Sequence, residues 1–249
     1  MLERSQACEG SRQPRSIGVM IGQLTNGGSE RQLYMFLAHC DRARSAPIVY
    51  VSGELGYWEA PIRKLGIPIV LLRGGPLAKM WQFRTACIAQ NVTCFFSWSS
   101  YTNGFGLALM GVGVHRIGSF RNALFDDLPT RLRWFWSWMS FAGVSTLVCN
   151  SRETHVQALS HGGSRKQVVY VPNAVQLFAP EQIRAWRKQW RSRLGLREDA
   201  VMVLGVGRLV PQKNFARFID VIAQVRRQLK SRLSSLAKTL DVWPSFRAK

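Results

Sequence analysis

Short apolar runs alternate along the chain with longer segments in which apolar residues recur at helical spacing. Seven runs have the length and the Val, Ile and Phe content of strands: Ser16–Gly22, Pro47–Ser52, Ile67–Leu72, Val92–Trp98, His115–Phe120, Ser145–Asn150 and Gln167–Val171. The segments between them predict helices: Ser29–His39, Trp58–Leu65, Leu77–Gln90, Asn103–Gly111, Pro129–Phe141 and Arg152–His161. Because the strand runs are almost continuously apolar, both faces should be covered. The pattern predicts an α/β fold with one parallel sheet and helices on both faces.

The pattern changes after Pro172. An amphipathic segment rich in Arg and Trp (Pro180–Leu194) leads to an apolar run that predicts a strand (Val201–Leu209) and then to a helix from about Asn214 to Leu229. One strand and one helix cannot bury a core, since a domain takes at least about 50 residues. The expected organisation is a disordered basic leader (1–15), a first domain (16–173), a linker (174–199), the start of a second domain (200–229) and a tail (230–249).

The formal net charge of +20 favours anionic partners: nucleic acid, acidic lipid or phosphorylated ligands. A nucleic-acid-binding protein is one alternative, but helix-turn-helix, zinc-finger and RNP patterns are missing, so this class is disfavoured.

The five scattered cysteines fit neither a disulfide framework nor a zinc site and are interpreted as reduced thiols in the cytosol. The leader has no apolar core and does not predict a secretory signal. Two uncharged stretches (85–114 and 134–151) are interpreted as buried strands and helices rather than membrane spans.

Gly27 and Gly28 follow the first predicted strand and precede a helix. Paired glycines let the backbone approach a ligand, and the N–H groups of a helix start favour anions. The alternative is a tight turn in which Ser29 is the N-cap of the helix.

The most specific motif is GVGRLVPQKN (Gly205–Asn214), which follows an apolar run and opens a helix. Arg208 and Lys213 would then project from the carboxyl end of a strand, where open α/β sheets bind ligands. Both side chains suit a diphosphate, because Arg binds its oxygens through a planar fork of N–H groups and Lys acts as a point charge. They would stabilise the negative charge of the diphosphate leaving group.

This motif resembles the GT-B glycosyltransferases of family 4. Three further segments agree with that family in order and spacing: G-G-S-E-R near the amino end, V-C-N-S-R-E (Val148–Glu153) and V-V-Y-V-P-N-A-V (Val168–Val175). The resemblance covers about 16–225 and implies a Rossmann-like first domain on the acceptor side, with the beginning of a second, donor-binding Rossmann-like domain.

The resemblance also implies retaining transfer of a sugar from a UDP- or GDP-linked donor to a glycan or lipid-linked acceptor in polysaccharide biosynthesis, with no cofactor or metal required. Arg208 and Lys213 match the basic pair that neutralises the donor diphosphate, and Asn214 ends the same motif. Gly27 and Gly28 match the loop that faces the donor.

Arg121, in S-F-R-N after the fifth predicted strand, falls where many family members have a functional histidine. The alternative is a surface salt bridge to Asp126 or Asp127. His115 stands at the start of its strand, and we interpret it as structural.

The largest departure from the family is the absence of the E-x7-E pair that contacts donor sugar and nucleotide. After Lys213 the acidic residues are Asp220 and Asp241 only. A frameshift or early stop near Lys230 would explain a shortened second domain, and the chain is then expected to be inactive or nearly so alone. A non-catalytic subunit that pairs with a chain supplying the donor half is the alternative.

The segment RLRWFWSWMSF (131–141) joins arginines to three tryptophans. This composition suits the interface of an anionic membrane, so the expected location is cytoplasmic with peripheral membrane contact. The alternative is a core helix whose aromatic face packs on the sheet.

Overall fold

The structure is a computed structural model that describes residues 13–122, 128–161, 167–207 and 209–229. The predicted leader up to residue 12 and the predicted tail lie outside these ranges. The chain divides into two compact units, of which the first ends at Val175 and the second begins at Gln176. The predicted boundary between first domain and linker falls two residues earlier.

The first unit contains one seven-stranded sheet in the order β3-β2-β1-β4-β5-β6-β7, and all neighbouring strands are parallel. Its strands are β1 (Arg15–Ile21), β2 (Ser45–Val51), β3 (Ile69–Leu71), β4 (Cys94–Ser97), β5 (His115–Phe120), β6 (Thr146–Cys149) and β7 (Gln167–Tyr170). All seven predicted strands are therefore confirmed, and the order of the strands is that of Rossmann-like folds.

The continuous apolar runs reflect burial on both faces of this sheet. Side chains of consecutive strand residues point to opposite faces. Val19 contributes to one buried cluster, together with residues of α1 (Gly28–Ala38) and α2 (Glu59–Lys64), whereas Met20 contributes to another with Phe83. A smaller cluster around Phe120 and Leu147 lies at the β5–β6 end of the sheet.

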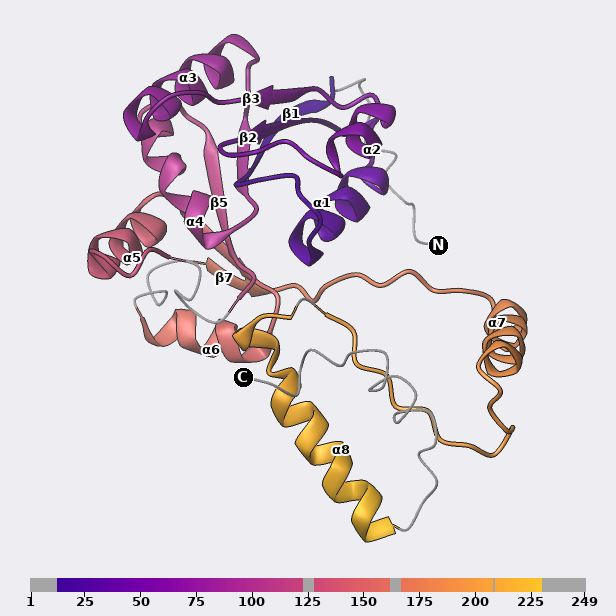
Figure 1. Ribbon diagram of the computed structural model, residues 1–249. Coiled ribbons are helices and arrows are strands. Elements are labelled where there is room, and N and C mark those ends of the chain that lie inside the picture. Colours follow the sequence, from indigo (N-terminus) through magenta and orange to yellow (C-terminus); the bar gives the residue numbers. More distant parts are fainter. Residues whose placement is uncertain (1–12, 123–127, 162–166, 208, 230–249) are drawn as a thin grey trace, which may run out of the picture. The chain divides into compact units, whose positions relative to one another are not determined.

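Helices cover both faces (Figure 1). Figure 1 shows α1 and α2 on one side of the sheet, and α3, α4 and α5 on the other. The helices of this unit are α1 (Gly28–Ala38), α2 (Glu59–Lys64), α3 (Pro76–Ala89), α4 (Ser100–Asn103), α5 (Arg133–Ala142) and α6 (Arg152–Ser160), and η1 (Gly104–Leu109) is a 3-10 helix. The helix predicted over Asn103–Gly111 is thus a 3-10 turn, since its three glycines disfavour an α-helix.

A buried polar network joins the carboxyl half of the sheet to α4 and α5. The Asn103 amide oxygen accepts a hydrogen bond from the backbone N–H of Ser119 (3.0 Å), and its amide nitrogen donates to Ser140 Oγ (3.0 Å). Ser140 Oγ in turn donates to the backbone oxygen of Ser100 (3.0 Å). Buried polar groups that satisfy one another fix the relative positions of the elements that carry them.

In the second unit the described residues form α7 (Pro180–Arg193), the 3-10 turn η3 (Pro211–Lys213) and α8 (Phe215–Leu229). The helix predictions for this region are confirmed. The prediction of a strand over Val201–Leu209 is wrong for residues 201–207, which form no strand. A strand needs a hydrogen-bonded neighbour, and no other strand is found in the described part of this unit.

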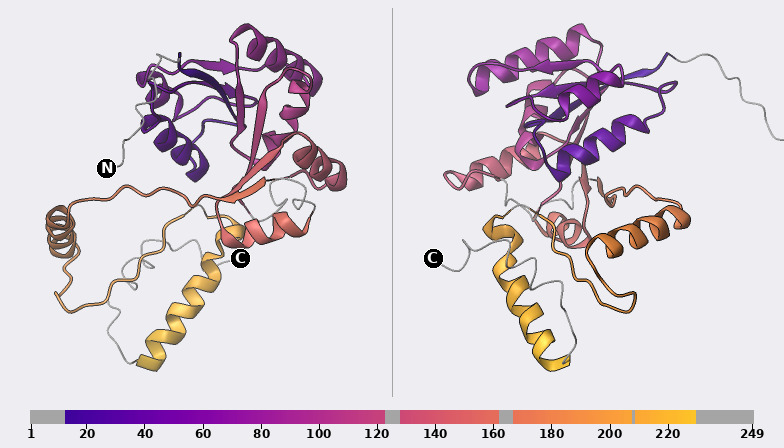
Figure 2. Two further views of the ribbon diagram at one scale, coloured as in Figure 1. Left: turned by 180° about the vertical axis from the view of Figure 1, so that it is seen from behind. Right: turned by 45° about the vertical axis from the view of Figure 1, so that its right-hand side comes forward.

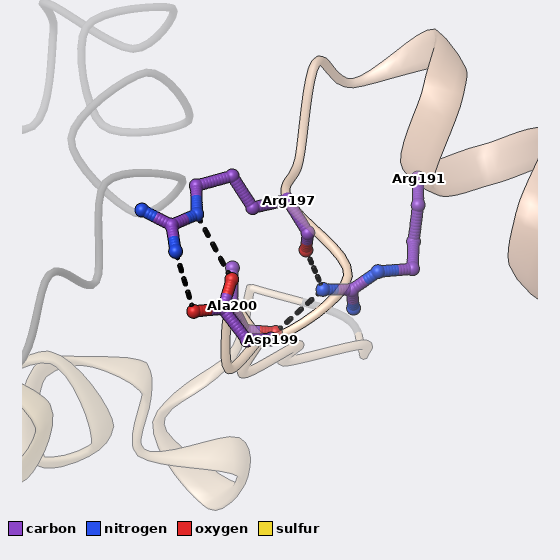
Figure 3. A network of polar contacts seen from close by, with 4 residues as sticks. All are labelled: Arg191, Arg197, Asp199 and Ala200. Carbon is purple, nitrogen blue, oxygen red and sulfur yellow. Dashed lines mark hydrogen bonds and ion pairs between the residues drawn. The ribbon is translucent and has the colours of Figure 1, made fainter.

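A buried arginine fixes the turn that follows α7. The side chain of Arg191 donates hydrogen bonds to the backbone oxygens of Arg197 and Ala200 (Figure 3). Arg197 forms an ion pair with Asp199 at 2.7 Å. Arg191 is therefore a structural residue, whereas the other basic residues of α7 lie exposed.

Among the described residues, none of the helices has the length and apolar character that a membrane crossing requires. The stretch 85–114 is divided among α3, β4, α4 and η1, and 134–151 between α5 and β6. The interpretation of both stretches as strands and helices is confirmed. Figure 2 shows the same elements from two further sides.

Candidate functional site

The first-unit site residues gather at the carboxyl edge of the sheet. In a parallel sheet, all strands end at the same edge, and ligands bind where the strand order reverses. Here the reversal lies between β1 and β4, which are neighbours in the sheet although β2 and β3 come between them in sequence. The loops after β1, β4, β5, β6 and β7 therefore define the candidate site.

The loop after β1 brings Gly27 and Gly28 to this edge. Gly27 has extended dihedral angles (φ −149°, ψ 168°) and is the N-cap of α1. The alternative that Ser29 is the N-cap is therefore wrong, because Ser29 already lies within the helix. Apart from its chain neighbours and the nearby backbone of α1, no atom of the described residues lies within 4 Å of the position that a Cβ on Gly28 would take.

A carboxylate of the chain itself occupies the space beside Gly27. A Cβ at Gly27 would lie 2.2 Å from Glu30 Oε2, so the absence of a side chain makes room for this acid. Glu30 is buried, with 7% exposure, and belongs to the first turn of α1, where the helix dipole favours negative charge. A phosphate approaching the same helix end would meet this carboxylate.

Trp98, at the end of β4, connects the loop after β1 to the next strand ends. Its indole N–H donates to the backbone oxygen of Ser29 at 2.9 Å. A second link comes from Gln32, whose amide exchanges two hydrogen bonds with the backbone of Ala174 (2.8 and 2.9 Å). The first turns of α1 are thus held against the ends of β4 and β7.

Arg121 follows β5 and lies over the ring of Trp98, with its Cζ 3.7 Å from the ring centroid. Its Nη1 is 3.5 Å from Asn173 Oδ1, and its Nε is buried with no hydrogen-bond partner among the described residues. Burial lowers the pKa of the Arg121 guanidinium to about 10, because water is removed from the charged form. At neutral pH it remains a cation.

The two asparagines beside Arg121 come from the next strand ends. Asn150 Nδ2 donates to the backbone oxygen of Arg121 (3.1 Å) and is 3.5 Å from Asn173 Oδ1. Both asparagines were contained in the motifs Val148–Glu153 and Val168–Val175, but they received no individual role. Asn150 directly follows β6 and Asn173 lies three residues after the end of β7, so their positions after strands could have identified them.

No acidic side chain of the described residues forms an ion pair with Arg121. Asp126 and Asp127, the predicted alternative partners, lie outside the described residues. A partly buried cation with an unpaired N–H is suited to an anionic oxygen of a ligand, since guanidinium binds phosphate and carboxylate through directed hydrogen bonds.

Three predicted site residues belong to the second unit. Arg208 lies outside the described residues. Lys213 is exposed at the end of η3, and Asn214 follows it in the left-handed conformation (φ 47°, ψ 48°). Asn214 Oδ1 accepts a hydrogen bond from the backbone N–H of Arg217 at 3.3 Å, so its side chain caps α8. A Cβ at Gly207 would lie 3.6 Å from Lys213 Cγ, which places the two ends of the GVGRLVPQKN motif together.

His115 lies at the amino end of β5, opposite to the candidate site. Its Nε2 is 3.3 Å from Thr146 Oγ1. Its structural interpretation agrees with this position. In the described ranges, no three His, Cys, Asp or Glu side chains gather in a way that could hold a metal ion.

The chain matches no known family model and no curated protein sequence. Its fold is similar to that of several solved structures. HepE of Anabaena, in complex with UDP-glucose, has a TM-score of 0.65 and 15% identity over 84% of this chain and 57% of HepE. The same protein with UDP and glucose gives a TM-score of 0.65 and 16% identity over 84% of this chain and 58% of HepE.

A glycosyltransferase from Rickettsia africae has a TM-score of 0.54 and 14% identity, over 80% of this chain and 54% of that protein. The chain spans little more than half the length of these structures. At this level of identity the likeness shows the fold alone, and it agrees with the predicted α/β, Rossmann-like class.

Proposed function

We propose that the chain is a glycosyltransferase of the GT-B architecture and of family 4, which moves a sugar with retention from a UDP- or GDP-linked donor to a glycan or lipid-linked acceptor in polysaccharide biosynthesis. The observation that carries this proposal is the partly buried Arg121, which lies over Trp98 at the carboxyl edge with an unpaired Nε. The motif GVGRLVPQKN in the second unit supports it, as does the UDP-glucose bound to HepE.

The donor diphosphate is assigned to Arg208 and Lys213. The capping of α8 by Asn214 supports this assignment, because the N–H groups at the start of α8 then follow directly after Lys213 and favour an anion. Gly27 and Gly28 are assigned to the uncharged part of the donor. Glu30 repels a phosphate there, but its carboxylate accepts hydrogen bonds from sugar hydroxyls.

Arg121 is assigned to an anionic oxygen of the donor as the leaving group departs. Its guanidinium is held in place before the ligand arrives, since Trp98 fixes its plane and Asn173 contacts one of its nitrogens. A preorganised cation of this kind costs no rearrangement as charge develops. The proposed mechanism, like the family resemblance, includes no metal. The proposed location is cytoplasmic, in peripheral contact with an anionic membrane.

Titration calorimetry with UDP and with GDP tests the donor assignment. We expect one of the nucleotides to bind, and Lys213→Ala to weaken its affinity about tenfold, as for the loss of one charged hydrogen bond. Arg217→Ala is the matched control, because it removes an exposed cation from the same end of α8 outside the motif. Equal weakening by both variants would indicate non-specific charge attraction, and binding of neither nucleotide would contradict the proposal.

The 249-residue polypeptide by itself should transfer sugar poorly. It carries no E-x7-E pair after Lys213, and each missing charged contact to the transition state costs roughly 100-fold in rate. We expect no product from UDP-glucose or GDP-mannose with purified polypeptide in a radiolabel transfer assay, even where calorimetry detects nucleotide binding. Adding a separate chain that carries the glutamate pair should restore transfer if this polypeptide is a non-catalytic, acceptor-binding subunit. Product formation by the polypeptide alone would refute the expectation.

A further inference from the structure

A cavity of about 250 Å³ lies in the first unit between the elements α3, α4, η1 and α5, and its lining does not include Arg121, Trp98, Asn150 or Asn173. Figure 1 shows α3, α4 and α5 along one side of the sheet, and η1 packs against both α3 and α5. The buried residues Ser52, Ser100 and Ser140 form its floor, and the exposed side chains of Leu77, Tyr101 and Phe135 form its mouth.

The cavity suits a hydrocarbon chain better than a polar ligand. Most of its lining is apolar, from side chains such as Met80, Phe105 and Met139. The polar groups near its floor already bind one another: Ser140 Oγ donates to the Ser100 backbone oxygen (3.0 Å). At about 250 Å³ it is smaller than the roughly 300–1,000 Å³ typical of sites that enclose a whole small molecule. It therefore fits part of a larger amphiphile.

The charges around the cavity favour an anionic head group. The four elements α3, α4, η1 and α5 contain Lys79, Arg84 and Arg133 but no Asp or Glu. Lys79 lines the cavity, and its Nζ donates to the Ser52 backbone oxygen at 2.5 Å. An ammonium group has three hydrogens, and no ion pair with Lys79 occurs in the described ranges. Lys79 is thus available to an anion at the cavity wall.

The two helices that border the cavity, α3 and α5, also carry exposed aromatic side chains. Leu77 on α3 is 81% exposed, and Trp81 lies one turn further along the same helix. On α5, Trp134 and Trp138 are exposed, whereas Phe141 packs against Phe120 at 5.4 Å. Phe141 thus packs as the core-helix alternative expects, whereas membrane contact by the exposed tryptophans stays a prediction. Exposed tryptophans beside basic residues are typical of surfaces that contact lipid.

We propose that this cavity binds the hydrocarbon chain of an anionic amphiphile, with Lys79 beside the head group. Naming that amphiphile as the lipid-linked sugar acceptor rests on the function proposed above, whereas the binding of the chain does not. The cavity would then hold the anchor of the acceptor and the Arg121 cluster would serve the transfer.

Titration calorimetry of the full chain with inorganic phosphate and with hexyl, octyl and decyl phosphate, each below its micellar concentration, tests the proposal. Affinity should rise about fourfold for each added methylene until the cavity is filled. Octyl glucoside, with the same chain and an uncharged head, should bind several-fold more weakly than octyl phosphate. Binding of inorganic phosphate as tight as that of octyl phosphate would overturn the proposal.

Two matched variants separate the cavity from the surrounding surface. Leu77→Gln changes the mouth and should weaken octyl phosphate about tenfold, whereas Trp81→Gln, on the same exposed helix but outside the cavity lining, should change it less than twofold. Equal weakening by both would mean surface adsorption and would sink the proposal. The alkyl phosphate titrations contain no nucleotide. Absence of alkyl phosphate binding would therefore not affect the UDP and GDP titrations, and absence of nucleotide binding would not affect the alkyl phosphate titrations.

Discussion

Replacing Gly106 by alanine is expected to destabilise the seven-stranded unit by about 3–5 kcal/mol, a large share of the stability of an ordinary domain. A Cβ at Gly106 would lie 1.9 Å from the backbone oxygen of Gly143. A backbone oxygen cannot rotate away, so η1 and the end of α5 must separate. The separation would also strain the Asn103 network, because Gly143 itself lies against the backbone oxygen of Asn103. Urea denaturation followed by tryptophan fluorescence would measure the loss.

Gly28→Ala is the matched control for this prediction. It also replaces a glycine at a helix, but within the described ranges no atom beyond its chain neighbours and the nearby helix backbone lies within 4 Å of the new Cβ. Its effect on the free energy of unfolding should lie between zero and a gain of about 1 kcal/mol, since alanine restricts the unfolded chain. A loss below about 1 kcal/mol for Gly106→Ala would show that η1 adapts without cost.

Replacing Arg121 by methionine should lower the affinity for the donor nucleotide about 10- to 100-fold while leaving the protein at least as stable. The first effect follows from the loss of a charge-assisted hydrogen bond. The second follows from burial, which lowers the Arg121 pKa to about 10 and so makes the charged form costly in the folded protein. That cost is present in full below about pH 10 and declines gradually above it, first as the folded protein and then, at still higher pH, as the unfolded chain loses the proton. The contact with Trp98 offsets part of the cost.

Calorimetric titration and thermal unfolding of the same samples would measure both effects. Arg116→Met is the matched control, because Arg116 belongs to β5, the strand that Arg121 follows, but lies near its amino end. It should leave the affinity for UDP unchanged. Arg121→Lys should recover only part of the affinity, because lysine keeps the charge without the planar fork. Unchanged affinity in Arg121→Met would remove Arg121 from the site.

Some features followed from local sequence alone. Runs such as 16–22 and 67–72 are almost entirely apolar, which predicts parallel strands covered by helices, and the periodic segments between the strands predict the helices. The segment 201–209 has the same composition but forms no strand over 201–207 in the described structure. Apolar composition gives a segment the tendency to pair, whereas pairing itself requires a neighbouring strand.

The candidate site was predictable in part. Arg121 was identified from the resemblance to family 4, in many members of which this position carries a functional histidine, and Gly27 and Gly28 from their place between a strand and a helix. The roles of Trp98 and Glu30 were missed, because neither a stacking contact across strands nor a carboxylate folded back over Gly27 leaves a signature in residue spacing.

The sequence by itself determined the α/β class, the places of the strands and most helices, and the basic motif around Lys213, because these depend on composition and on short-range periodicity. Only the tertiary structure decided the strand order, the contact of Arg121 with Trp98, and the cavity between α3 and α5. Those features depend on which distant segments become neighbours, and that choice is made by packing the whole unit at once.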